Sequence, residues 1–225
     1  MSTTVRYDVI DSEDDGFSGQ VYWGFYATQW LYLGAQLDSN QERWGIFTRF
    51  QNIQIPKGSE IISARIGIYH STKTMSNGSP KCSVYFQDTG NVAAPPATWE
   101  EFQNLSLTSG ISWDVESFAG GEVQYSPDIK EILQLIIDKE DYELGSSIMI
   151  IVRTNDSETG SNVTQLSSFE EGLPLFLEVE YSPVKVTTLQ PSNITQSNFV
   201  ANGSIDSIGE GITVVKRGFC YKVKE

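Results

Sequence analysis

Alternating apolar and polar positions predict short β-strands along most of the chain. The period of two recurs in segments rich in Ile, Val, Tyr and Phe, the pattern of half-buried strands. These segments are 3–10, 46–55, 60–69, 81–88, 122–125, 146–153 and 175–181. Clusters of turn-forming residues such as 56–59, 76–80 and 119–121 separate them. The pattern contains no β-α-β succession, so it predicts an all-β sandwich of antiparallel sheets.

One segment has the period of an amphipathic helix instead. Its apolar residues recur at i, i+3, i+4, i+7 and i+8, which places them on one helical face: Ile129, Ile132, Leu133, Ile136 and Ile137. Before them, Ser126 is suited to the N-cap, Pro127 to the first helical position and Asp128 to the positive end of the helix dipole. We predict a helix over residues 127–139 whose apolar stripe packs on the sandwich.

The charge of the chain excludes several classes of partner. Among 225 residues there are 29 acidic and 15 basic side chains, a formal net charge of -14. Such a surface repels phosphate backbones and anionic lipid, so we expect no nucleic-acid binding.

The longest apolar run, 148–152, is far below the roughly 20 residues that cross a bilayer, so we expect no membrane insertion. Residues 1–15 contain no apolar stretch of the kind a secretory signal needs.

A change in composition near Pro183 predicts a domain boundary. Residues 1–182 carry 10 basic and 26 acidic side chains, whereas 183–225 carry 5 and 3 and are rich in Thr, Ser and Asn. The second part has strand-like segments at 184–189, 198–205 and 212–221. We therefore expect one sandwich over 1–182 and a separate β unit over 183–225.

The first unit resembles the DNRLRE-type module. The resemblance rests on an Arg-Phe strand at 49–50, an Ile-Pro-x-Gly turn at 55–58 and an Ile-x-Ser-Ala strand at 61–64. Further agreeing segments are 14–16, 31–34, Trp113, 126–129, 169–172 and 174–181. The resemblance covers residues 1–182. It implies a jelly-roll β-sandwich related to carbohydrate-binding modules, of the kind found on secreted cell-surface proteins and in tailed-phage structural proteins.

The second unit resembles the beginning of a fibronectin type III-like domain, in the form found in phage and bacterial surface proteins. The matching segments are 186–189, 192–195, 202–205, 209–211 and 216–221. A complete domain of this kind has about 100 residues and seven strands, but 183–225 supplies 43 residues. We expect the natural polypeptide to continue, or this segment to complete a sheet with a neighbouring subunit. The contact residues would be Phe199, Val200, Ile212, Val214, Phe219 and Tyr221.

Aromatic residues are concentrated between positions 17 and 44, interleaved with Gly and Gln. Exposed aromatic faces bind the apolar side of a sugar ring, while buried ones fill a core or a subunit interface. Both interpretations remain open for the four candidates: Trp23, Trp30, Tyr32 and Trp44.

Acidic residues also cluster, at positions 11–16. Asp11, Asp14 and Asp15 with the Gly16 turn supply several oxygens, which suits Ca²⁺, although the spacing is not that of an EF-hand. A structural Ca²⁺ site and a solvated loop are the alternatives, and no other cofactor is expected.

Catalytic chemistry has little support in the sequence. The single histidine, His70, ends a predicted strand and has no nucleophile motif around it. Three carboxylate pairs could serve a glycosidase, but adjacent acids are frequent in so acidic a chain: Glu100 with Glu101, Asp114 with Glu116, and Glu170 with Glu171. We therefore expect a non-enzymatic protein. The two resemblances together imply an oligomeric structural or adhesive component of a phage virion, with other virion subunits as partners. The alternative is a carbohydrate-binding module of a bacterial cell-surface protein, with a glycan as ligand.

Overall fold

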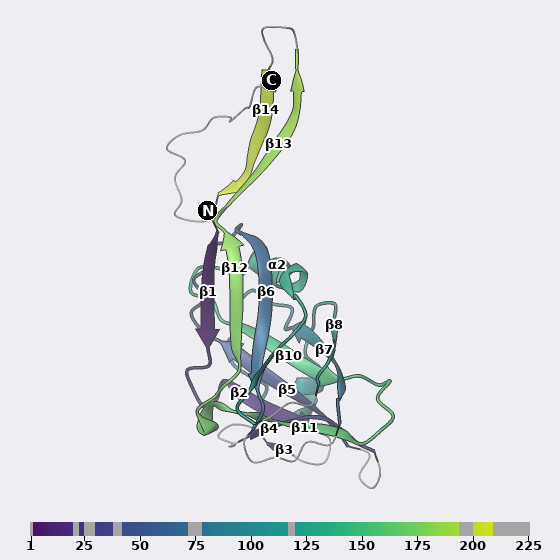
Figure 1. The fold of residues 1–225 in the computed structure, drawn as a ribbon. Helices are drawn as coiled ribbons and strands as arrows, with labels where there is room; N and C mark the ends of the chain where they lie inside the picture. The colour runs from purple at the N-terminus through teal and green to yellow at the C-terminus, as the bar shows by residue number, and fades with distance from the viewer. Residues whose placement is uncertain are drawn as a thin grey trace.

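The computed structural model describes residues 2–19, 23–24, 30–37, 42–71, 78–116, 120–193 and 200–208 of the chain. Two antiparallel sheets pack face to face within it (Figure 1). The smaller sheet has the strand order β1-β12-β6-β9. Its strands are β1 (Thr3–Asp8), β12 (Phe176–Ser182), β6 (Glu60–Tyr69) and β9 (Val123–Tyr125).

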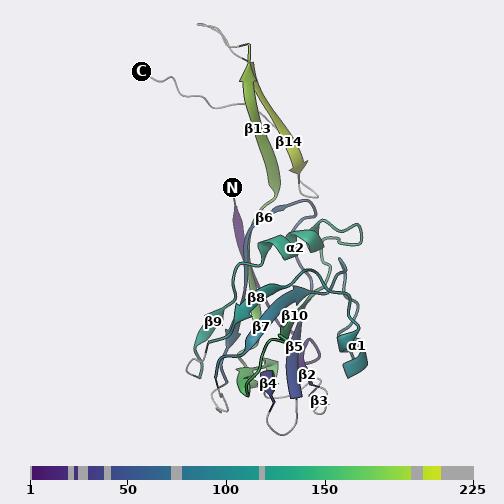
Figure 2. The same cartoon turned by 90° about the vertical axis from the view of Figure 1, so that its right-hand side faces the viewer.

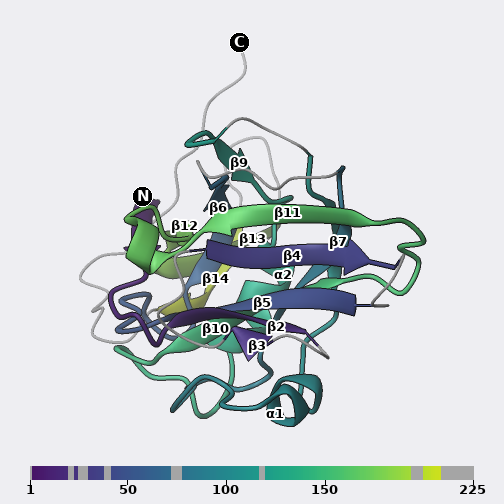
Figure 3. The same cartoon turned by 90° about the horizontal axis from the view of Figure 1, so that it is seen from below.

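The larger sheet has the order β11-β4-β5-β10-β7-β8 (Figure 3). In addition, β2 pairs with β5, and β3 pairs with β2. Its members are β2 (Asp15–Gly19), β3 (Trp23–Gly24), β4 (Trp30–Gln36), β5 (Glu42–Phe50), β7 (Lys81–Phe86), β8 (Ile111–Asp114), β10 (Ile148–Thr154) and β11 (Asn162–Ser167). Of these, β2, β3, β4, β8 and β11 were not among the predicted strands.

The strand pairing is that of a jelly roll. Five antiparallel pairs are nested in the sequence: β1 with β12, β4 with β11, β5 with β10, β6 with β9 and β7 with β8. This nesting is what results when one long hairpin is rolled into two packed sheets. The expectation of an all-β jelly-roll sandwich is confirmed.

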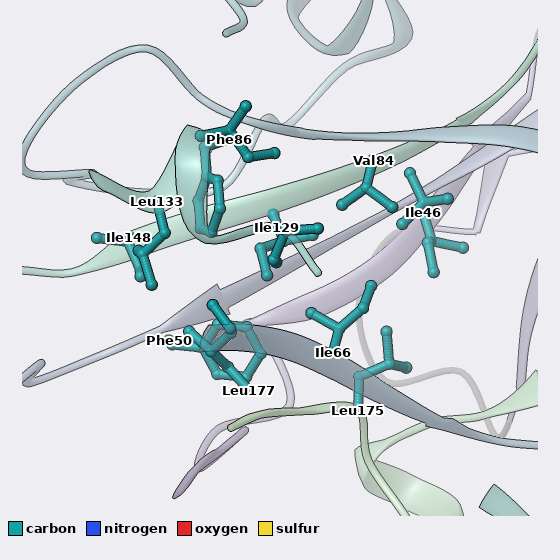
Figure 4. Close-up of a cluster of buried hydrophobic side chains, with 14 of the residues drawn as sticks. Ile46, Phe50, Ile66, Val84, Phe86, Ile129, Leu133, Ile148, Leu175 and Leu177 are labelled. Atoms are coloured by element: carbon teal, nitrogen blue, oxygen red, sulfur yellow. The ribbon is translucent and has the colours of Figure 1, made fainter. Parts of the chain in front are cut away.

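The core lies between the two sheets and is closed by a helix. Figure 4 shows side chains from β5, β6, β7, β10 and the β12 region converging on the same interior as Ile129 and Leu133. Alternation explains which residues enter it, because the buried Leu177 and Val179 on β12 flank the outward-facing Glu178.

The outer face of the larger sheet is buried as well. Phe47 on β5 with Met149 and Ile151 on β10 forms a second cluster with Val92 and Phe102. Phe102 belongs to the short helix α1 (Trp99–Gln103), which the sequence patterns did not predict. Thr98 caps this helix by accepting a hydrogen bond from the Glu101 N–H.

Helix α2 (Lys130–Ile137) confirms the predicted apolar stripe but begins three residues later than expected. All five residues of the stripe are buried. Ser126 is not the N-cap, because its hydroxyl accepts from the Ile66 N–H of β6 and donates to the Pro127 carbonyl. Asp128 accepts from the N–H groups of both Ala64 and Lys130. The preceding residues thus continue the pairing with β6 before the helix starts.

The last two described strands form a separate ribbon. Strands β13 (Val184–Ser192) and β14 (Val200–Ile208) pair antiparallel with each other. β13 follows β12 after Pro183, and Figures 1 and 2 show the ribbon extending beyond the end of the sandwich. No helix in the described ranges is long and apolar enough to cross a bilayer.

The burial of the helical stripe predicts the effect of placing a charge in it. Leu133 has no exposed surface, so Leu133→Asp should lower the free energy of unfolding by roughly 3–5 kcal/mol in urea denaturation. Leu135→Asp is the matched control, because Leu135 lies on the same helix and is 54% exposed. Equal stability of the two variants would contradict the placement of the helix.

Candidate functional site

The acidic loop before β2 is tied to the larger sheet by Asp14. Its side chain is 1% exposed, and Arg49 Nη1 on β5 lies 3.0 Å from Asp14 Oδ1. Gln51 Nε2 donates to the second oxygen, Oδ2, at 2.6 Å. Arg49 also donates from Nε to the Val92 carbonyl, which connects the loop to the segment covering the outer face. A buried ion pair with both carboxylate oxygens bound is a structural clamp, because removing one partner leaves an uncompensated charge.

Asp15 lies in a different environment from its neighbour. It is 1% exposed, stands opposite Thr48 in the β2–β5 ladder and accepts the Phe169 N–H at 2.9 Å. Burial, opposed by that hydrogen bond, raises the pKa of Asp15 to about 7, and the nearby charges of Glu170 and Asp14 add to the rise.

The three aspartates of the candidate Ca²⁺ site therefore use their oxygens in separate contacts. Asp11 is exposed and accepts the Glu13 N–H through Oδ1, in a local turn. Within the described ranges, no group of three His, Cys, Asp or Glu side chains is arranged to hold a metal ion. The geometry assigns Asp14 and Asp15 to packing of the loop against β5 and the turn η1 (Phe169–Glu171).

The aromatic candidates are partly incorporated in the core. Trp44 is 7% exposed and belongs to the main hydrophobic cluster. Tyr32 packs against that cluster, its ring centroid 6.0 Å from Trp44 and 5.1 Å from Phe17. Trp30 is half-buried opposite Ser167, and Trp23 pairs through its backbone with Ser18. Trp44 and Tyr32 thus support the packing interpretation.

His70 lies near the carboxylate pair Glu170 and Glu171, where the end of β6 meets β11. His70 is 1% exposed, forms a bridge with Leu166 of β11, and burial lowers its pKa. The Ser71 hydroxyl donates to Glu171 Oε1 at 3.1 Å, and that of Ser168 donates to Glu170 Oε2. These contacts join the end of β6 to β11 and η1, in agreement with a structural strand-end role for His70.

Of the predicted subunit-contact residues, Val200 lies in β14 and is 45% exposed. Phe199, Ile212, Val214, Phe219 and Tyr221 lie outside the described residues. Leu189 and Ile205 of the ribbon, which sequence reasoning did not select, are 52% and 36% exposed.

The outer face of the smaller sheet carries a group of side chains that the sequence patterns did not predict. In the ladder, Arg6 pairs with Glu178. The neighbouring row runs across the sheet from Asp8 through Phe176 and Gly67 to Tyr125. We name this the outer-sheet face; it comprises Arg6, Asp8, Arg65, Gly67, Tyr69, Tyr125, Phe176, Glu178 and Glu180. Its residues come from four strands and follow no local motif.

No protein-family model matches the chain, and no curated protein matches it. Among solved structures it is similar to the enzymatically active domain of tailspike protein 4 from bacteriophage CBA120, with 7% sequence identity and a TM-score of 0.25. The match covers 80% of this chain and 19% of that chain.

The contacts of Asp14 and Asp15 predict that a chelator changes stability little. We expect the melting temperature to be the same in EDTA and in buffer, because these carboxylates already have protein donors. A large fall in EDTA that added Ca²⁺ restores would show that the loop holds a metal.

Asp15 also predicts a pH dependence of stability. Its pKa in the fold, about 7, lies above the ordinary 3.8, so the folded chain keeps a proton that the unfolded chain releases. The contribution of Asp15 to the stability of the fold is fully present below its pKa in the unfolded chain. It is lost as the pH rises through its pKa in the folded chain, about 7. Between pH 5 and pH 8.5, the free energy of unfolding of the wild type should therefore fall by a few kcal/mol relative to that of Asp15→Asn. The conversion is about 1.4 kcal/mol per unit of pKa shift.

The matched control for this measurement is Asp11→Asn, since Asp11 is exposed in the same loop. Urea unfolding of the three proteins at each pH supplies the comparison. A constant difference between wild type and Asp15→Asn across this range would contradict the assignment.

Proposed function

We propose that this chain is a non-enzymatic structural and adhesive protein of a tailed-phage virion, which contributes to particle assembly or to attachment at the host surface. The proposal rests on the resemblance of 1–182 to DNRLRE-type modules and of 183–225 to fibronectin-like domains. The observation that supports assembly is the β13–β14 ribbon, which lies outside the sandwich and exposes apolar side chains.

The ribbon has the physical properties of an unfinished sheet. A two-stranded ribbon is only marginally stable in water, because it buries little apolar surface. Within the described residues β13 and β14 pair only with each other, so the second edge of each strand carries no described strand. Leu189, Val200 and Ile205 add exposed apolar surface along it. Such an edge accepts strands from another chain, and a neighbouring subunit would bury these residues.

The alternative function is a carbohydrate-binding module of a bacterial cell-surface protein. One observation favours it, namely the combination of aromatic and charged side chains on the outer-sheet face. The two functions are compatible, because the ribbon and that face belong to different sheets.

The assembly contact is tested with the full chain by light scattering over a range of concentrations. We expect concentration-dependent association, and we expect Leu189→Lys to raise its dissociation constant tenfold or more, because the contact would bury the introduced ammonium group. Leu144→Lys is the control, since Leu144 is 47% exposed on the sandwich.

Amide hydrogen exchange supplies the opposing outcome. If the chain stayed monomeric while 184–193 and 200–208 were strongly protected, the ribbon would be stable alone and the proposed contact would be wrong. Association that Leu189→Lys leaves unchanged would also contradict it.

A further inference from the structure

The outer-sheet face is organised around Phe176, a residue that points away from the core yet is 1% exposed. Gly67, its neighbour in the ladder, makes room for the ring: a Cβ at Gly67 would lie 2.0 Å from Phe176 Cζ. The Arg6 guanidinium carbon lies 3.6 Å from the ring centroid, in a cation–π contact. Tyr69 and Tyr125 surround the same ring, with centroids at 5.7 Å and 5.8 Å.

Polar contacts hold this aromatic group in place. Arg6 donates from Nε and Nη2 to Asp8 Oδ1, at 2.9 Å and 2.7 Å. Arg6 also interacts with the Tyr69 side chain, and the Tyr125 hydroxyl with Glu178. The strands that carry these side chains, β1, β6, β9 and β12, pair with one another in the sheet. The relative positions of the residues are therefore fixed before any ligand binds.

The same residues remain accessible from solvent. The side chains of Arg6 and Asp8 are 42% and 47% exposed, and Tyr125 is 43% exposed. In Figure 1, β1, β12 and β6 lie side by side in front of the larger sheet. The face therefore presents an aromatic ring, a guanidinium group and carboxylates together.

We propose that the outer-sheet face binds an uncharged glycan, with a pyranose ring packed on Tyr125 and its hydroxyls hydrogen-bonded to Arg6, Asp8 and Glu178. The C–H face of a sugar ring is apolar and packs on aromatic side chains. Its vicinal hydroxyls donate to carboxylates and accept from the planar guanidinium fork.

Charge selects a neutral sugar over other ligands. The face carries two basic residues, Arg6 and Arg65, and three acidic ones, Asp8, Glu178 and Glu180, so its local charge is nearly balanced. The chain as a whole has a charge of -14 and repels polyanions. A protein partner is disfavoured because the centres of protein interfaces are depleted of Asp and Glu, whereas this face carries Asp8, Glu178 and Glu180 on two adjacent strands.

This site deepens the attachment part of the proposed function and rests on it, but it uses residues distinct from the aromatic candidates at 23–44. Affinity electrophoresis of the full chain through gels containing dextran, mannan, galactomannan or xylan tests it, with heparin as the polyanionic comparator. We expect retardation by at least one neutral polysaccharide and none by heparin. Retardation by heparin alone, or by none of the five, would overturn the proposal.

Variants then identify the face. Tyr125→Ala should weaken binding tenfold or more, while Tyr125→Phe, which keeps the ring, should weaken it less than about threefold. Leu135→Ala is the control for an exposed side chain elsewhere on the sandwich. Circular dichroism verifies that each variant is folded.

Two results would count against this location. Binding unchanged in Tyr125→Ala would overturn it, as would binding lost in Trp30→Ala but kept in Tyr125→Ala, which would move the site to the aromatic segment. Failure of the ribbon contact is a separate result, because Leu189→Lys changes the oligomeric state and leaves the outer-sheet face intact.

Discussion

The sandwich depends on the burial of strand β10 on both faces. Ile148, Ile150 and Val152 enter the core between the sheets, while Met149 and Ile151 point to the opposite side, and all five are at most 1% exposed. A strand of this kind must be covered twice, because its backbone is paired on both edges and its side chains from 148 to 152 are all apolar. The smaller sheet and α2 provide one cover. Helix α1 and the chain around Val92 provide the other, which explains why an irregular segment is needed between β7 and β8.

Buried polar groups fix the position of the chain where apolar packing cannot. The ion pair of Asp14 with Arg49 and the hydrogen bond from Phe169 to Asp15 attach one acidic loop to β5 and to the turn η1. Burying charge carries a desolvation penalty, and Asp15 shows it through a raised pKa. A cluster of acidic residues can therefore either bind a metal ion or form ion pairs and hydrogen bonds inside the protein. Which of the two occurs depends on where the partner groups lie. Arg49 lies 35 residues from Asp14, beyond the reach of a local pattern.

Strand β6 and helix α2 each have one apolar and one polar face, and both were predictable from the sequence. Strand β6 occupies the predicted residues 60–69, and the Ile and Leu stripe of α2 is buried as expected. Strands β2 to β4 were missed because glycine and aromatic residues obscure their alternation, and α1 because five residues are too few to show a period. The outer-sheet face had no signal at all. Arg6, Tyr125 and Phe176 come together through strand pairing alone, which no spacing along the chain reveals.

The direct connection between β12 and β13 has a mechanical consequence. Strand β12 is paired on one side with β1 and on the other with β6, and β13 leaves from its end after Pro183 (Figure 1). A pull on the ribbon along the direction of β12 would load the hydrogen bonds of both ladders at the same time, since those bonds run perpendicular to the strands. Loaded in shear, the bonds resist together, whereas bonds opened from one end break in succession. Tension on the ribbon would thus enter the sandwich through a strand that is held by ladders on both of its edges.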